Sequence, residues 1–154
     1  MSSGGSENQP NLQIMAQYIK DLSFENPGAP QGFTTNPQME FGVDLQARAV
    51  SPEFHEVVLI MRVNAKSEDK AVFVLELAYA ALVRMVNIPE EAAQTILLIQ
   101  TPTLLFPFAR RIVADMVRDG GMPPLVIEPI DFVALYQSKM GKAPTPPTPV
   151  AGNA

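Results

Sequence analysis

The stretch of sequence that decides the fold is FHEVVLIMRVNAKSEDKAVFVLELAY, residues 54–79. It contains two runs rich in apolar and β-branched residues, 54–65 and 72–79, on either side of a short charged segment. Two such runs around a polar segment predict a β-hairpin. An antiparallel strand with one solvent-exposed face alternates apolar and polar residues, but here the residues of both faces are largely apolar. We therefore expect something to cover much of both faces of this hairpin.

Two further strands are expected before the hairpin. Residues 12–24 alternate in a way that indicates a strand, and residues 41–46 alternate apolar residues with polar or small ones. The segment NPGAPQG at 26–32 separates these two runs, and Ser51 with Pro52 marks a turn before the hairpin. The sequence therefore predicts four strands in succession.

Helical spacing replaces this alternation in the second half of the chain. Pro89 and two following glutamates are typical of the first turn of a short helix, and we expect a loop at Pro102. Pro107 is expected to begin the main helix, which the glycines at 120–121 end, and Asp131 is expected to cap a last helix. Strands followed by helices predict an α+β fold, here a four-stranded antiparallel sheet with helices packed on one face.

Length and composition fit one domain. Of the 154 residues 47% are hydrophobic and 18% are charged, so we expect a folded body at 11–141 between disordered tails at 1–10 and 142–154. The absence of cysteine excludes disulfides and zinc–thiolate sites and fits a reducing compartment. The sequence shows neither a signal-peptide pattern nor a run of about 20 apolar residues, so we expect a cytoplasmic protein without membrane insertion.

The residues that could carry catalysis are few. His55 is the single histidine, and a catalytic triad or a zinc site would need partners that the sequence does not supply, so we expect a structural or interface role. Carboxylates occur at 68–69, at 90–91 and at Glu53 with Glu56, each beside a turn or helix start where charge is normally solvated. No glycine-rich phosphate loop is present. We therefore expect no catalytic residue, metal site or cofactor, and no enzyme.

Charge is distributed unevenly along the chain. Residues 1–100 carry twelve acidic and six basic side chains, whereas residues 101–154 carry four and five. The acidic, strand-rich part favours a basic partner and disfavours nucleic acid. The predicted helices can cover one face of the sheet, so the second face and part of the first helix are expected to form a large apolar patch. Such a patch indicates self-association or a hydrophobic client.

Six blocks of sequence match one known family, in the same order, over about residues 11–140. They are YIKDLSFE (18–25), NPGAP (26–30, apart from Gly28), EVVL (56–59), LLFPFAR (104–110), DGGMPPL (119–125) and PIDFVALY (129–136, apart from Val133). With these blocks the chain resembles the SecB family of bacterial protein-export chaperones, and the last two look like its alphaproteobacterial branch. The resemblance implies a Greek-key-like sheet and a homotetramer built as a dimer of dimers, with the main helix, residues 107–119, between the dimers.

The resemblance also implies a function and a set of residues. The role would be ATP-independent holding of unfolded precursor proteins and their delivery to SecA. The acidic patch that receives the basic, zinc-binding end of SecA would consist of Asp21, Glu25, Val74 and Glu76. The candidates for a groove that binds clients are Phe24, Phe33, Met39, Phe41, Leu59 and Met61. The candidates for the oligomer interface are Phe108, Ile112 and Met116.

Other interpretations stay open at this point. Each groove candidate can equally be an ordinary core residue, and the carboxylates can simply solvate an edge. A second hypothesis is a structural, obligate oligomer whose apolar face is used up by self-association. A third, with less support from the sequence, is a domain that binds or converts a small molecule.

Overall fold

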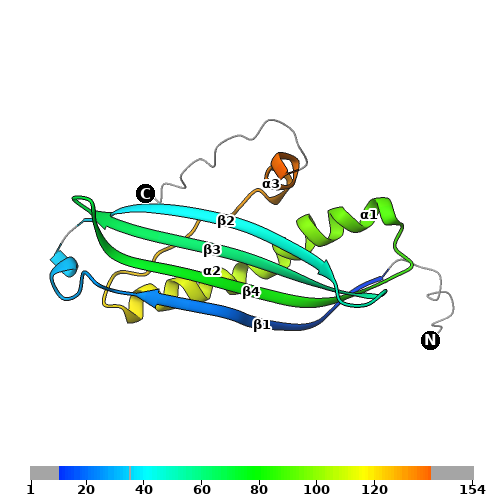
Figure 1. Cartoon of the computed structure of the whole chain (residues 1–154), viewed down its shortest axis with the longest axis horizontal. Helices are drawn as coiled ribbons and strands as arrows, with labels where there is room; N and C mark the ends of the chain where they lie inside the picture. Colours follow the sequence, from blue (N-terminus) through cyan, green and yellow to red (C-terminus); the bar gives the residue numbers. More distant parts are fainter. Residues whose placement is uncertain (1–10, 35, 140–154) are drawn as a thin grey trace.

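A four-stranded antiparallel sheet dominates the structure, a computed structural model that describes residues 11–34 and 36–139. The predicted tails lie outside these residues. The strands are β1 (Asn11–Glu25), β2 (Gln38–Ala49), β3 (Phe54–Ser67) and β4 (Lys70–Val86), in the order β1-β4-β3-β2 (Figure 1). Hairpins join β2, β3 and β4, and β1 lies beside β4, which is the Greek-key arrangement. The predicted fold class is confirmed.

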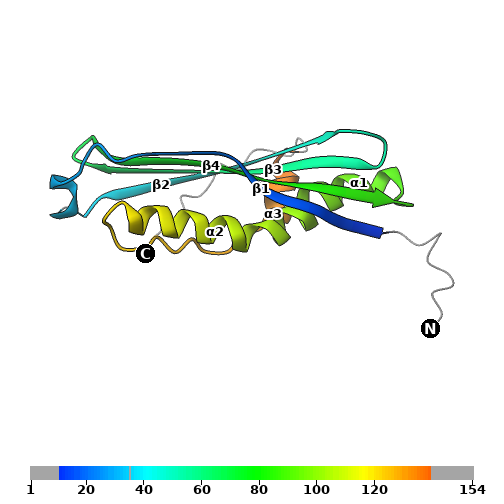
Figure 2. The same cartoon turned by 90° about the horizontal axis from the view of Figure 1, so that it is seen from below.

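The helices form one layer on one side of the sheet (Figure 2). They are α1 (Glu90–Thr95), the π-helical η3 (Ile96–Gln100), α2 (Thr101–Asp119) and α3 (Phe132–Lys139), whereas the short η2 (Gln31–Thr34) lies at one end of the sheet (Figure 2). Of these, α2 packs on β3 and β4. We call the face of the sheet under α2 the inner face, and the opposite face the outer face.

The main helix begins earlier than the sequence predicted. Helical structure is continuous from Glu90 to Asp119, so Pro102, the second residue of α2, lies within helical structure rather than in a loop, and Pro107 lies inside α2. Leu105 and Phe106, which precede Pro107, are buried in the core, with Phe106 packed on Phe132 of α3, and this burial favours the helical conformation across the proline. Prolines normally mark helix boundaries, which is why the sequence placed the start at Pro107.

The segment Glu90–Asp119 is unusually apolar. It has 30 residues and contains an 18-residue window with a mean hydropathy of 1.3, so by length and composition alone it is able to cross a membrane. Within the chain 39% of its most apolar window is buried, and Leu104 and Phe108 remain about half exposed. Both residues lie in α2, whereas the predicted apolar surface is on the short helix that follows Pro89, so that expectation stays a prediction. The length of this apolar segment was not expected from the sequence.

The outer face does not form the large apolar patch that the sequence predicted. Val58, Ile60 and Ala80 lie there and are at most 9% exposed, because Tyr18 and Ala78 pack around them. Tyr18 reaches them because it lies opposite Ala80 in the β1–β4 register. The covering of both faces is therefore confirmed, and side chains of the sheet itself provide the outer cover.

Candidate functional site on the outer face of the sheet

The register of β1 with β4 brings the predicted acidic residues together. Glu25 lies opposite Val74, and Ser23 lies opposite Glu76. Asp21 lies opposite Ala78, two residues along β4 from Glu76. Directly opposed residues of antiparallel strands point to the same face, so these side chains share the outer face. We call Asp21, Glu25, Val74 and Glu76 the acidic patch.

The members of the acidic patch are accessible. Asp21 and Glu25 are exposed, and neither makes an ion pair with another residue in the described part of the chain. Val74 is 37% exposed. The carboxylate of Glu76 accepts a hydrogen bond from Arg62 at 3.1 Å, and both side chains are about half exposed. An exposed pair of this kind contributes little free energy, so Glu76 remains available to another cation.

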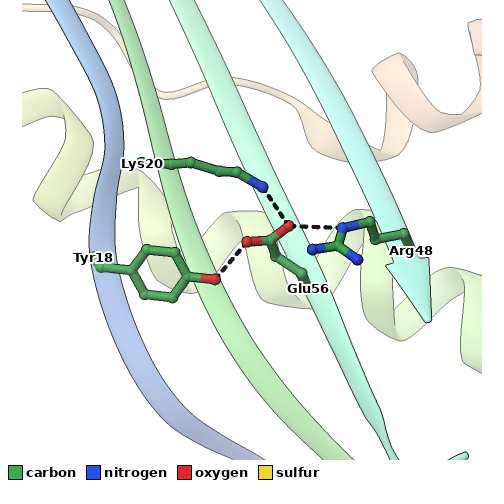
Figure 3. A network of polar contacts seen from close by, with 4 residues as sticks. All are labelled: Tyr18, Lys20, Arg48 and Glu56. Carbon is green, nitrogen blue, oxygen red and sulfur yellow. Dashed lines mark hydrogen bonds and ion pairs between the residues drawn. The ribbon is translucent and has the colours of Figure 1, made fainter. Parts of the chain in front are cut away.

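A buried carboxylate lies next to the acidic patch. Glu56 of β3 is 5% exposed and accepts three hydrogen bonds (Figure 3). They come from Tyr18 Oη at 2.6 Å, Lys20 Nζ at 2.7 Å and Arg48 Nε at 3.0 Å. Tyr18 and Lys20 belong to β1 and Arg48 to β2, so one carboxylate ties both edge strands to the centre of the sheet. We call these four residues the Glu56 network.

The Glu56 network has strong electrostatic consequences. Hydrogen bonds from Lys20 and Tyr18 lower the pKa of Glu56 from 4.5 to about 2, although burial acts in the opposite direction. Burial and the hydrogen bond to Glu56 raise the pKa of the Tyr18 hydroxyl from 10.0 to about 12. The position of Glu56 beside a turn predicted a solvated carboxylate, like that of Glu53, and for Glu56 this prediction was wrong. Glu53 pairs instead with Arg84 at 3.1 Å.

A β-bulge in β1 separates the Glu56 network from the acidic patch. The register with β4 shifts between Ile19 and Asp21, so Lys20 has no partner residue of its own on β4. A bulge of this type allows two consecutive residues to point toward the same face. Lys20 points outward to Glu56, and Asp21 is outward opposite Ala78. Beyond the bulge, Leu22 and Phe24 turn inward and pack against the core.

The six groove candidates lie on the inner face or beside it, and the structure does not gather them into one lining. Leu59 and Met61 are fully buried core residues, so neither is open to a client in this conformation. Phe24 and Phe41 lie in the same cross-strand row but on opposite edge strands, β1 and β2. Met39 is half-buried on β2. The candidates are thus separated, with two in the core under the central strands and the others at or beside the edges of the sheet.

The C-terminal end of α2 explains the position of the two phenylalanines on the β1 side. A Cβ on Gly120 would lie 2.6 Å from the Phe24 ring, and one on Gly121 would lie 2.7 Å from the Phe33 ring. Asn26 donates a hydrogen bond to the Gly120 carbonyl at 2.9 Å. Gly121 also has a φ of +93°, which favours glycine. Phe33 is nevertheless 48% exposed, so it presents apolar surface beside this end of the helix.

The three interface candidates on α2 differ in exposure. Phe108 is 44% exposed, and its ring stacks on Tyr79 with centroids 6.4 Å apart. Ile112 is 9% exposed and Met116 packs against the core, so both are used largely within the chain. Leu104, which was not among the residues predicted from the sequence, is 49% exposed one turn before Phe108. The sequence contained a signal for Leu104, because it precedes Phe108 by four residues and such residues lie on the same face of a helix.

A cavity of about 440 Å³ lies where β3 begins and β4 ends. His55, Glu53 and Glu90 line it among residues that include no serine, threonine, cysteine or lysine, so no triad is formed there. The Nδ1 atom of His55 is buried and has no hydrogen-bond partner within the described residues. Among those same residues no group of three His, Cys, Asp or Glu side chains could hold a metal ion.

Comparison of the fold with solved structures gives the class of protein. The SecB-like chaperone of Mycobacterium tuberculosis, solved in complex with a peptide from an antitoxin, has a TM-score of 0.65 and 17% sequence identity. The match covers 77% of this chain and 90% of that one, so the two share a fold. The class is thus that of SecB-like folds.

Comparison of the sequence gives the family. The family model for SecB, preprotein translocase subunit, matches residues 5–143, and the chain belongs to this family. The protein-export protein SecB of Paramagnetospirillum magneticum is 51% identical over 87% of this chain and 88% of its own length. That of Parvibaculum lavamentivorans is 47% identical over 92% and 87%. The resemblance to the alphaproteobacterial branch is confirmed.

Proposed function

We propose that this chain is an ATP-independent export chaperone of the cytoplasm, which holds precursor proteins unfolded and delivers them to SecA. The family supports the chaperone class, because relatives that cover most of the chain are protein-export proteins. The chemistry is binding alone: burial of apolar client segments contributes about 25 cal/mol per Å² against the cost of ordering the client. No covalent step and no cofactor belong to it.

The observation that carries delivery to SecA is the register of β1 with β4. It assembles Asp21, Glu25 and Glu76 around Val74 on one exposed face. Carboxylates around an apolar centre complement a small, basic partner surface, because charge steers the encounter and the apolar contact adds affinity. We propose that this acidic patch receives the basic, zinc-binding C-terminal end of SecA. The zinc belongs to the partner.

The client surface is proposed on the inner face where α2 ends. Phe33 presents the most exposed aromatic ring there, and Phe24, Met39 and Phe41 are half-buried at the two edges. Methionine and phenylalanine accept apolar segments of varied shape, which suits a protein with many clients. Leu59 and Met61 support this surface from the core without contacting a client.

Self-association into a homotetramer, as a dimer of dimers, is proposed through α2. Leu104 and Phe108 expose apolar surface one turn apart on α2, although the Phe108 ring also stacks on Tyr79 of the sheet. Ile19 of β1 lies opposite Tyr79, on which Phe108 stacks, and it is 48% exposed. An apolar surface of this kind on a helix layer favours contact with a second copy. Such contact leaves the outer face free for SecA.

The experiment that tests delivery is the substitution Glu76→Lys, with binding to purified SecA measured by calorimetry. We expect loss of SecA binding, because a carboxylate in the acidic patch becomes a cation facing a basic partner. Binding of an unfolded client should stay unchanged. Glu53→Lys is the matched control, because Glu53 is also half exposed and paired with an arginine but lies outside the acidic patch. Equal SecA affinity for the wild type and Glu76→Lys would refute the assignment.

A further inference from the structure

The Glu56 network is attached to β1 at its β-bulge, and the proposed function assigns no role to this attachment. Tyr18 and Lys20 flank Ile19, where the register shift begins, and both donate to the same buried carboxylate. Glu56 is reached across β4, which lies between β1 and β3 and has the small residue Ala80 opposite Tyr18 (Figure 3). A large side chain at that position would obstruct the path from Tyr18 to Glu56.

The bulge decides which face the following residues occupy. In a regular strand, successive side chains alternate, so Lys20 and Asp21 would point to opposite faces. The extra residue at the bulge resets this alternation, so Asp21 and Glu25 are exposed while Leu22 and Phe24 pack in the core. Loss of the bulge would bring the two carboxylates toward the core face.

We propose that Glu56 is a positioning residue, whose hydrogen bonds to Tyr18 and Lys20 hold the bulge and so keep Asp21 and Glu25 on the same face as Glu76. The three donors leave Glu56 almost no contact with water, at 5% exposure. The hydrogen bond from the Lys20 ammonium to the Glu56 carboxylate joins two charged groups, so it is a strong, charge-assisted attachment to β1. The consequence for affinity rests on the proposed function of the acidic patch, whereas the consequence for the bulge does not.

The positioning role and a simple effect of charge predict opposite changes in SecA affinity when the Lys20 cation is removed. Lys20 is a cation immediately before Asp21, so its removal makes the outer face more acidic. By Coulomb attraction alone, a variant without this cation would bind a basic partner more tightly. If Lys20 and Glu56 instead hold the bulge, the same variant binds more weakly, because Asp21 and Glu25 are no longer fixed.

The test uses the full-length chain with the substitutions Lys20→Met and Tyr18→Phe. Arg84→Met is the matched control, because Arg84 is also an outer-face cation bonded to a glutamate, Glu53, at 3.1 Å. Amide hydrogen exchange of residues 19–25 reports on the bulge, and calorimetry reports the affinity for SecA. Both variants should lose about tenfold in SecA affinity, the loss typical of a broken hydrogen bond to a charged group. Their exchange at 19–25 should be faster by a similar factor, with the control unchanged.

The outcomes separate this inference from the proposed function. Unchanged exchange at 19–25 in both variants, or tighter SecA binding by Lys20→Met, overturns the positioning role of Glu56. A wild-type chain that does not bind SecA refutes the proposed function alone, and hydrogen exchange still decides whether Glu56 holds the bulge. Lys20 is 44% exposed, so Lys20→Met is expected to fold even if Tyr18→Phe does not. Tyr18→Phe changes no charge, so weaker binding by that variant has no Coulomb explanation.

Discussion

Replacing Glu56 with glutamine should remove a large, pH-dependent part of the stability of the sheet. The pKa of Glu56 is lowered from 4.5 to about 2. At about 1.4 kcal/mol for each pKa unit, this corresponds to ~3 kcal/mol in favour of the charged form. The partners Lys20 and Arg48 are 44% and 65% exposed, so they regain water when the charge is removed. We therefore expect Glu56→Gln to cost about 2–3 kcal/mol at pH 7.

The sign of the pH dependence follows from the lowered pKa. A carboxyl group whose pKa is lower in the folded state contributes its full stabilisation above its unfolded pKa, here 4.5. This contribution decreases as the pH falls from 4.5 toward 2, where the folded carboxyl also becomes protonated. The difference in stability between the wild type and Glu56→Gln should therefore be constant from pH 7 to about pH 5.5 and should decrease below that.

The assay is urea unfolding at one fixed protomer concentration, because association makes apparent stability depend on concentration. Wild type, Glu56→Gln and the control Glu53→Gln are compared at pH 7, 5 and 3.5. Glu53 belongs to an exposed pair, so its substitution should cost less than about 1 kcal/mol. A Glu56→Gln difference that is no larger than the control, or that stays the same at pH 7 and pH 3.5, would refute the reasoning.

Three further predictions concern other parts of the chain. Gly121→Ala should lower the free energy of unfolding by about 1–2 kcal/mol in urea, because of its positive φ and the nearby Phe33 ring, whereas Gly42→Ala, with open space around it, should not. Phe108→Asp should reduce the mass measured by light scattering from near four times 16.8 kDa to a smaller species, and an unchanged tetramer would count against α2 as the interface. Phe33→Ser should weaken binding of a denatured polypeptide about tenfold in a fluorescence titration, and equal binding would remove Phe33 from the client surface.

Much of the sheet could be predicted from the sequence, because strand signals are local. The hairpin at 54–79 is apolar on both faces, and the structure covers both, with α2 on one and Tyr18 on the other. The start of the main helix could not be predicted in the same way. Pro102 and Pro107 are local signals for a boundary, whereas the burial that keeps the helix continuous depends on tertiary packing.

The acidic patch could be predicted from the sequence, whereas the Glu56 network could not. Family motifs pointed to Asp21 and Glu76, and the strand register then placed them on one face. Glu56 was misassigned because its position next to a turn indicates a solvated carboxylate. Its burial depends on donors from two other strands, Tyr18 being 38 residues away in sequence. No local pattern contains that information. A single carboxylate beside the apolar run at 57–61 was nevertheless a signal, because a carboxylate that is buried there needs a hydrogen-bond partner.

The central claim is that this chain holds polypeptides in an unfolded state, and one binding measurement tests it most directly. Calorimetry would compare a precursor protein in its denatured form, diluted into buffer, with the same protein in its native form. We expect the denatured form to bind with roughly micromolar affinity or tighter, because only it exposes the apolar segments that the inner-face surface can bury. The native form should show no binding. Equal binding of both forms, or no binding of either, would contradict the account.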